Sequence, residues 1–261
     1  MKGTVTFFST CLVEHVYPDA GIDSVALLEL CGYQVQLPTY QSCCAQPAYN
    51  SGAIKDAVAV AKTTIDLLSE NNDPVIVPSA ACADMIINHY PSLLSNNETY
   101  KAKALALSSR SFELIGFISD DLPRIEKQRL SALIHEPASP ASSKIMLHNS
   151  CSARRGTKTS SSWRSSLEKS GIKICEPSYA EECCGFGGTF AVKSPEVSSA
   201  MADDKCKHLG DSHNHFSSGD CGCLMHLNGY AEKQGLFIRG EHIATTLARQ
   251  YGIACGDNHD K

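Results

Sequence analysis

The sequence predicts an α/β fold made of two duplicated β-α-β-α-β-α halves, whose parallel sheets are related by an internal pseudo-symmetry. One observation is a pattern of four cysteines that recurs 140 or 141 residues further along the chain. The other is that β-prone runs and helical patterns alternate within each half. Such alternation is typical of parallel strands joined by right-handed helical crossovers, and a repeat of this length indicates a duplicated unit.

Composition and charge narrow the class of protein. The 261 residues are 43% hydrophobic, which is enough for a buried core. The net charge of -5 comes without a basic block, so we expect neither nucleic acid nor an anionic membrane as a partner. The apolar runs are far shorter than the ~20 residues of a membrane span, and the first residues do not resemble an export signal. We therefore expect a cytoplasmic protein without a membrane span.

The thirteen cysteines include two sets of four with the same internal spacing. In each set, 31 residues separate the first cysteine from an adjacent pair, and the fourth cysteine follows after a similar interval. Four positions that match with a single residue of slippage indicate a duplicated site. The first set is Cys11, Cys43, Cys44 and Cys82, and the second is Cys151, Cys183, Cys184 and Cys223.

Each of these cysteine positions follows a β-prone run. The expected strands are 5–8, 33–37 and 74–77 in the first half, and 144–147, 172–175 and the surroundings of 215–216 in the second. A helix is clearest over 54–68, where apolar residues recur at steps of three and four. In open parallel sheets, ligands gather beyond the carboxyl ends of the strands, so we expect the four cysteines of each half to meet there.

The chain divides into three segments. Residues 1–98 form the first cysteine-rich half, and residues 144–261 form the second. Between them, residues 99–143 combine a helical connection with a linker rich in Pro and Ser, which puts the boundary near residue 140. The Ser-rich stretch 157–166 is expected to be a surface loop that leads into a helix.

Metal binding explains the cysteines better than disulfides do. An odd count cannot pair completely, and disulfide scaffolds are typically small exported domains. Neither half offers the two C-x2-4-C knuckles of a structural zinc site. Adjacent cysteines such as Cys43 and Cys44 point in different directions, which favours one multi-iron cluster in each half. Gly185, Gly187 and Gly188 would let backbone N–H groups approach such an anionic cluster and bind it.

Two stretches of the chain resemble the twin cysteine-rich CCG motifs of the lactate-utilisation protein A family. They are Cys43-Cys44-Ala45-Gln46-Pro47-Ala48-Tyr49-Asn50-Ser51-Gly52 and Cys183-Cys184-Gly185-Phe186-Gly187-Gly188-Thr189-Phe190. Also similar are His148-Asn149-Ser150-Cys151 and Cys223-Leu224-Met225-His226-Leu227, so the resemblance is collinear and covers nearly the whole chain. Related domains occur in heterodisulfide reductase, in the glycolate oxidase iron–sulfur subunit and in the anaerobic glycerol-3-phosphate dehydrogenase complex.

The resemblance implies an iron–sulfur oxidoreductase subunit of a complex that oxidises L-lactate to pyruvate. It implies two four-iron clusters, cubane or non-cubane, held by the eight cysteines of the repeat. It also implies two further subunits, one of them a ferredoxin-type iron–sulfur protein. Several of the related proteins include a ferredoxin module with a C-x2-C-x2-C-x3-C-P run, which this chain lacks. No G-x-G-x-x-G follows a strand, so we expect electrons to enter or leave through a partner.

Some positions leave the interpretation open. The family has glycine where this chain has Ala45, which adds a methyl group beside the first site and could push the backbone away from it. Cys221 is either a fifth thiolate or a neighbour of the second site. His213 and His215 precede Cys221 and Cys223 at a spacing that mimics a zinc site, so a zinc-stabilised, non-redox binding protein is one alternative. A second alternative is an iron–sulfur protein that takes part in disulfide reduction or acts on glycolate.

Other residues near the cysteines have both a functional and a structural interpretation. His148 is a candidate hydrogen-bond donor or proton carrier, while a histidine at a strand end is more often structural. Arg154, Arg155 and Lys193 either attract a carboxylate such as lactate or form a solvated basic rim. The cysteines without repeat-related partners are expected to be small buried hydrophobes; they are Cys31, Cys175, Cys206 and Cys255.

Overall fold

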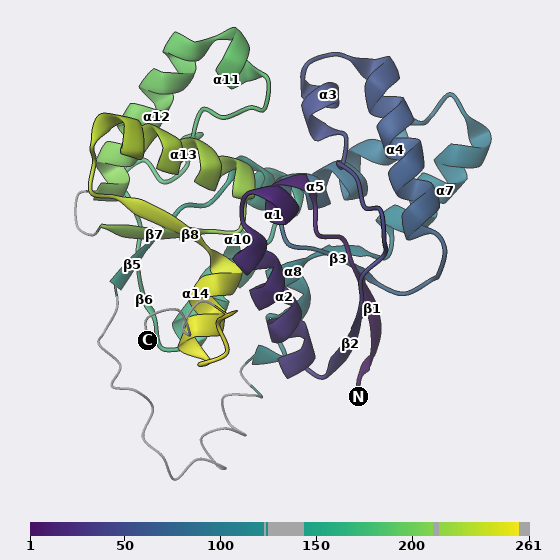
Figure 1. Ribbon diagram of the computed structural model, residues 1–261, viewed down its shortest axis with the longest axis horizontal. Helices are drawn as coiled ribbons and strands as arrows, with labels where there is room; N and C mark the ends of the chain where they lie inside the picture. The colour runs from purple at the N-terminus through teal and green to yellow at the C-terminus, as the bar shows by residue number, and fades with distance from the viewer. Residues whose placement is uncertain (123, 125–143, 211–213, 256–261) are drawn as a thin grey trace.

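Each half of the chain folds around its own four-stranded parallel sheet. The computed structural model describes residues 1–122, 124, 144–210 and 214–255. The first sheet has the order β2-β1-β3-β4 and the second the matching order β6-β5-β7-β8, which confirms the predicted duplicated α/β fold (Figure 1). The strands are β1 (Gly3–Phe7), β2 (Tyr33–Gln36), β3 (Val75–Val77), β4 (Ser111–Glu113), β5 (Lys144–Leu147), β6 (Lys173–Cys175), β7 (His215–Ser218) and β8 (Arg239–His242).

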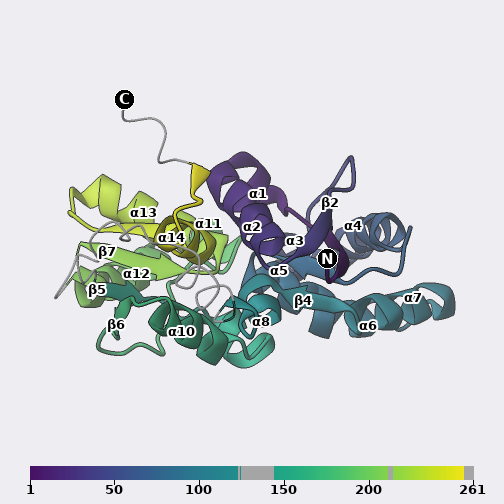
Figure 2. The same cartoon turned by 90° about the horizontal axis from the view of Figure 1, so that it is seen from below.

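Helices connect the strands within each half, and the two halves lie side by side (Figure 2). In the first half they are α1 (Cys11–His15), α2 (Pro18–Leu30), α3 (Gln46–Asn50), α4 (Ile54–Leu68), α5 (Ala80–Asp84), the π-helix η1 (Met85–His89), α6 (Tyr90–Leu93), α7 (Glu98–Ser108) and α8 (Leu114–Ile118). In the second half they are the π-helix η2 (Ser152–Gly156), α10 (Ser160–Lys169), α11 (Phe190–Lys193), α12 (Pro195–Gly210), α13 (Cys221–Gln234) and α14 (Ile243–Gln250). Among the described residues, none of these helices has both the length and the apolar character that crossing a bilayer demands.

The six predicted strands are confirmed to within two residues at each end, and so is the helix over 54–68. The prediction of three strands in each half is wrong, because β4 and β8 add a fourth parallel strand to each sheet. β4 lies inside the segment that was expected to be helical, and the Pro- and Ser-rich linker lies outside the described residues. Helix α10 starts at Ser160, so most of the expected Ser-rich loop is helical.

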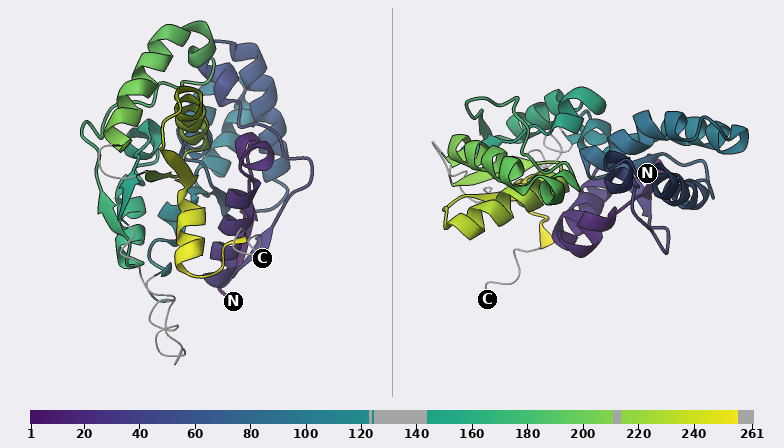
Figure 3. Two further views of the ribbon diagram at one scale, coloured as in Figure 1. Left: turned by 60° about the vertical axis from the view of Figure 1, so that its left-hand side comes forward. Right: turned by 90° about the horizontal axis from the view of Figure 1, so that it is seen from above.

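One of the three apolar core clusters among the described residues spans both halves. Helix α14 packs beside α2 of the other half, as the yellow and purple helices in Figure 3 show. Side chains of both halves belong to the same buried cluster, among them Phe7 and Leu27 of the first half and Trp163 and Leu247 of the second. The repeated units therefore share a core across their boundary.

The last strand of each sheet ends in a polar residue that reaches the other half. Glu113, at the end of β4, caps α8 and accepts a hydrogen bond from Trp163 Nε1 at 3.0 Å. His242, at the end of β8, caps α14 through Nδ1 and donates from Nε2 to the carbonyl of Pro78 at 2.9 Å. These buried hydrogen bonds fix the orientation of one half against the other.

Candidate metal centres

Three loops carry the cysteines of each half, and they leave the sheet at the carboxyl ends of three neighbouring strands. The first cysteine follows the central strand β1 or β5, and the adjacent pair follows the outer strand β2 or β6. The fourth cysteine lies in the helix after β3 or β7. Because parallel strands end at the same edge of a sheet, the four thiols of each half converge there, as the repeat predicts.

In the first site, the thiols face one another at short distances. The Sγ atoms of Cys44 and Cys82 lie 3.0 Å apart, and those of Cys11 and Cys43 lie 3.9 Å apart. These separations are well beyond the ~2.05 Å of a disulfide bond. No disulfide joins any of the thirteen cysteines, all of which are among the described residues. The buried Thr64 hydroxyl donates to the carbonyl of Cys43 at 3.0 Å and fixes this loop.

The second site repeats this geometry. The Sγ atoms of Cys184 and Cys223 lie 3.1 Å apart, and the thiols of Cys151 and Cys183 hydrogen-bond to each other. The backbone N–H of Gly185 points at Sγ of Cys183 over 3.4 Å. A backbone donor in this position stabilises negative charge on the sulfur.

In each adjacent pair, the pKa of the first thiol is lowered, which favours its ionisation. A hydrogen bond from Cys11 is the main cause that lowers the pKa of Cys43 to about 3, and one from Cys151 lowers the pKa of Cys183 to about 2. The same bonds raise the pKa of Cys11 and of Cys151. Four thiols this close cannot all ionise alone, because the thiolates would repel one another. The donor set therefore fits a metal ion or cluster, whose positive charge would let every thiol ionise.

The residue after each cysteine pair has a left-handed backbone. Gly185 has φ +89°, and Ala45 has φ 69°. A Cβ at position 185 would lie 2.7 Å from the carbonyl oxygen of Ser198 and 2.9 Å from Cβ of Met201, so only glycine fits there. In the first half the alanine is accommodated, and its N–H still hydrogen-bonds to Cys43. The methyl group thus leaves the first loop in the same arrangement as the second.

Gly187 and Gly188 continue the second loop with φ values of 52° and 63°. A Cβ on Gly188 would lie 3.7 Å from Cα of Pro47, at the start of helix α3 directly after the first cysteine loop. The second cysteine loop therefore lies against the start of α3 in the other half. The expected role of these two glycines in binding a cluster stays a prediction.

The imidazole of His148 is buried beside the second site. One ring nitrogen and the Sγ atoms of Cys184 and Cys223 all lie within 4.8 Å of one another. Both ring nitrogens are buried and make no hydrogen bond to the described residues. Burial is the main cause that lowers the pKa of His148 to about 3, which keeps the ring neutral. A neutral, unpartnered imidazole that faces thiols can bind a metal or donate a hydrogen bond to a sulfur ligand.

Sequence reasoning missed Lys205, whose side chain is completely buried at the second site. Its Nζ donates to the carbonyl of Tyr179 at 2.8 Å, and its charge acts on all four thiols of the site. One signal could have revealed it. Lys205 continues the buried stripe of α12 formed by Ser198, Ala202 and Leu209 at helical spacing.

Asp220 was missed as well, although it connects the two sites. Its Oδ1 accepts from the N–H of Gly222 at 3.2 Å, at the start of α13. Its Oδ2 accepts from the N–H of Ala81 at 3.1 Å, at the start of α5 in the other half. One carboxylate thus caps both helices that carry a fourth cysteine. Burial is the main cause that raises the pKa of Asp220 to about 6, against the effect of these hydrogen bonds.

The basic residues predicted near the second site have different surroundings. Arg154 donates to the carbonyl of Glu181 at 2.5 Å and pairs with the carboxylate of the same residue at 2.8 Å. It therefore anchors the loop before the second cysteine pair. Arg155 and Lys193 are exposed, and the charge of Arg155 acts on Cys151. Whether they form a basic rim or attract a carboxylate stays a prediction.

The other cysteines are placed mainly in or near the core. Cys221 is buried at the start of α13, and burial raises the pKa of its thiol. Its role as a fifth ligand stays a prediction. Cys31 is buried, and Cys206 is buried with its thiol directed at the carbonyl of Leu227. Cys175 and Cys255 are only half-buried, so the expectation that they are buried hydrophobes is wrong for these two.

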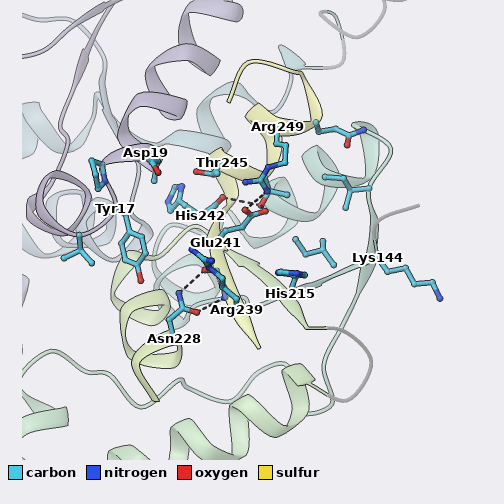
Figure 4. A pocket seen from close by; sticks show the side chains of 18 residues that line it. Tyr17, Asp19, Lys144, His215, Asn228, Arg239, Glu241, His242, Thr245 and Arg249 are labelled. Carbon is cyan, nitrogen blue, oxygen red and sulfur yellow. Dashed lines mark hydrogen bonds and ion pairs between the residues drawn. The ribbon is translucent and has the colours of Figure 1, made fainter. Parts of the chain in front are cut away.

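A cavity of about 690 Å³ lies between the start of α2 and the second sheet (Figure 4). None of the described residues that line it is a cysteine. Some of its polar groups bind one another, since Arg249 pairs with Glu241 at 2.7 Å and Asn228 holds the backbone of Gly240. The cavity is therefore separate from both cysteine sites.

The alternative zinc site is not formed as the spacing suggested. His215 starts strand β7 and lines the cavity of Figure 4, whereas Cys223 follows the other end of that strand. A strand of four residues spans ~13 Å, which is too far for both side chains to bind one ion. His213 lies outside the described residues.

The two repeated halves each have a parallel sheet and four cysteines that converge at its edge. These features define a protein with twin cysteine-rich α/β domains. The comparison with family models supports this class. The family described as "CCG: Cysteine-rich domain" matches residues 5–87 and 145–228, once in each half. The two matches contain all eight cysteines of the repeat.

Curated relatives identify the family more narrowly. "Lactate utilization protein A" of Geobacillus sp. (strain WCH70) is 35% identical over 246 residues, which is 93% of this chain and 98% of the relative. "Lactate utilization protein A 1" of Bacillus mycoides (strain KBAB4) is 36% identical over 93% of this chain and 96% of its own. "Lactate utilization protein A" of Shouchella clausii (strain KSM-K16) is 36% identical over 93% of this chain and 98% of the relative. The chain belongs to the lactate utilization protein A family.

Proposed function

We propose that this chain is the iron–sulfur subunit of a multi-protein complex that oxidises L-lactate to pyruvate, and that it transfers electrons between its partners. The observation that carries the proposal is the pair of sites in which four thiols converge on one point. The name of the relatives supports the substrate. The oxidoreductase activity belongs to the assembled complex, with two further subunits, one of them a ferredoxin-type iron–sulfur protein.

Each site would bind one four-iron cluster through its four cysteines. A bound cluster of this type supplies one-electron chemistry at a potential that the surrounding protein sets. The protein orients the ligands with the loop contacts described above, and Gly185 would bring its N–H to the sulfur atoms. The ligands would be Cys11, Cys43, Cys44 and Cys82 in one site and Cys151, Cys183, Cys184 and Cys223 in the other.

The proposed ligands of each site are buried on one side and partly exposed to solvent on the other. Cys44, Cys184 and Cys223 are buried, whereas Cys11 and Cys151 are half-buried. The buried ligands keep water from the inner side of each site. Because electron transfer needs close approach, partner subunits would dock on the side of the half-buried ligands.

The first experiment measures iron, acid-labile sulfide and the EPR spectrum of the full chain, purified without oxygen. About eight irons per chain are expected for two four-iron clusters, with the content reduced by roughly half in Cys11→Ser and in Cys183→Ser. Cys255→Ser, outside both sites, is the matched control and should keep the full content. Stoichiometric zinc in place of iron would contradict the proposal and favour a zinc-stabilised binding protein.

The second experiment tests the substrate with the reconstituted complex. L-lactate should reduce the EPR-active centres of this chain, and the Cys183→Ser variant should block electron flow to the acceptor. Glycolate and heterodisulfides serve as the competing substrates. Reduction by glycolate alone, or turnover of a heterodisulfide alone, would overturn the lactate assignment and leave the iron–sulfur assignment intact.

A further inference from the structure

The two candidate sites share their thiol geometry but differ in the residues packed around the thiols. His148 stands one residue after strand β5, where the first half has the buried Phe8 after β1. Lys205 occupies in α12 the position that Thr64 occupies in α4, counted from the first residue of each helix. Thus an apolar ring and a neutral hydroxyl in the first site correspond to an imidazole and an ammonium group in the second.

The ammonium group of Lys205 is placed to act on the sulfur ligands. Its side chain has 0% exposed surface, so water screens its charge little. The hydrogen bond to the carbonyl of Tyr179, four residues before Cys183, holds the group against the cysteine loop. Burial lowers the pKa of this ammonium group, whereas Coulombic attraction to the four thiols of the second site favours its charged form. In the first site, the shifted pKa values of Cys11, Cys43 and Cys44 arise from hydrogen bonds with neighbouring cysteines, burial, Coulombic interactions between the thiols and backbone amides.

Other features of the surroundings are shared by the two sites. The inner cysteines Cys44 and Cys184 are equally buried, and a backbone N–H reaches the preceding thiol in each loop. Asp220 is not shared in this way: its buried carboxylate caps a helix of each site, but its charge raises the pKa of Cys223 in the second site, against the effect of Lys205. Glu182, which opposes the charge of Lys205, is exposed and screened by water.

We propose that Lys205, together with His148, gives the second site a higher reduction potential than the first. The proposal rests on the proposed function, because it requires an iron–sulfur cluster in each site. Reduction adds one negative charge to a cluster, and a buried positive charge nearby stabilises the reduced form more than the oxidised form. The N–H of His148, which no described residue accepts, adds a donor toward the sulfur atoms and acts in the same direction.

The test is a redox titration of the holoprotein that is monitored by EPR. It does not require catalytic turnover. Cys11→Ser perturbs the signal of the first site and so assigns the two midpoint potentials. In the wild-type protein, the second site should have the higher potential. An equal or higher potential in the first site would overturn the proposal, whatever the variants show.

Variants then assign the difference to the two residues. Lys205→Met should lower the potential of the second site only, Lys205→Arg should restore it, and His148→Phe should lower it to a smaller extent. Lys207→Met is the matched control, because Lys207 is exposed on the same helix and pairs with Asp203. Unchanged second-site potentials in loaded Lys205→Met and His148→Phe proteins would overturn the assignment. A wild-type protein without iron would instead refute the proposed function on which it rests.

Discussion

Gly185 is the residue at which a single added methyl group should matter most for the second site. Its φ is +89°, and a Cβ would lie 2.7 Å from the carbonyl oxygen of Ser198. Strained left-handed conformations and clashes of this kind cost on the order of 1–3 kcal/mol. We expect Gly185→Ala to lower the free energy of unfolding by about that amount and to reduce the iron bound at the second site. Chemical denaturation and iron analysis measure both effects.

The first half supplies the control for this substitution. Ala45 already has the methyl group at the corresponding position, with φ 69°. Ala45→Gly should therefore change the iron content little. If Gly185→Ala kept full iron and full stability, the close approach to Ser198 would be unimportant.

Glu113 should make the stability of the protein depend on pH. Its carboxyl group is buried between the halves, and burial raises its pKa from 4.5 to about 7. Between these values the folded state binds more protons than the unfolded state, so stability decreases as pH rises through this window. The contribution is on the order of 3 kcal/mol.

The measurement compares unfolding curves of the wild type and Glu113→Gln from pH 4.5 to pH 7. Trp163 is the only tryptophan of the chain and donates to Glu113, so its fluorescence reports the contact directly. The decrease with pH should be missing in Glu113→Gln and present in Glu168→Gln, whose side chain is exposed on α10. Parallel curves for the wild type and Glu113→Gln would contradict the prediction.

Helices α5 and α13 begin at one shared carboxylate, so they should respond together to its removal. An N-cap contributes about 1 kcal/mol, and a buried amide left without an acceptor costs about 1–3 kcal/mol more. Asp220→Ala should therefore lower the free energy of unfolding by roughly 2–4 kcal/mol and reduce the iron bound at both sites. Calorimetry and site-resolved EPR of the variant measure these changes.

The N-cap of α5 itself provides the comparison. Ser79 stands at the position that corresponds to Asp220, and its side chain makes no capping hydrogen bond. Ser79→Ala should have a much smaller effect on stability and iron content. A loss of iron restricted to the second site in Asp220→Ala would show that the contact with Ala81 does not support the first site.

The strands that sequence reasoning found and missed differ in physical character. Sequence patterns predict apolar, β-prone strands well. One example is Val75–Val77, which is fully buried in the centre of its sheet. Strand β8 consists of Arg239, Gly240, Glu241 and His242, which have no strand-forming pattern. It forms because Phe216 of β7 packs on Gly240 and Asn228 holds the Gly240 backbone. Neither contact is visible in the local sequence.

The shared core makes the two halves depend on each other. Leu114, Ile115 and Ile118 of the first half pack in one cluster with Ile243 and Leu247 of the second. Each such side chain contributes about 1.5–3 kcal/mol when buried. The fragments 1–122 and 144–261, produced separately, should unfold at much lower temperature than the full chain and bind a hydrophobic dye. Mixing them should restore part of the lost stability.

Circular dichroism of the two fragments and of their mixture is the measurement. The fragments separate the two cysteine sites as well, so iron analysis adds a second readout. Fragments that melted like the full chain would show that each half is an independent domain, contrary to the common core.

The sequence by itself determined the duplicated α/β fold, the cysteine sets and the family. These follow from spacing, periodicity and motifs, which are properties of the chain read in order. Tertiary packing decided what surrounds the thiols: Asp220 reaches Ala81 of the other half, and Lys205 turns inward to the second site of its own half. A lysine in a helix is normally solvated, and its burial depends on a carbonyl acceptor and on thiols that only the fold brings near. The difference between the two sites therefore had to come from the folded structure.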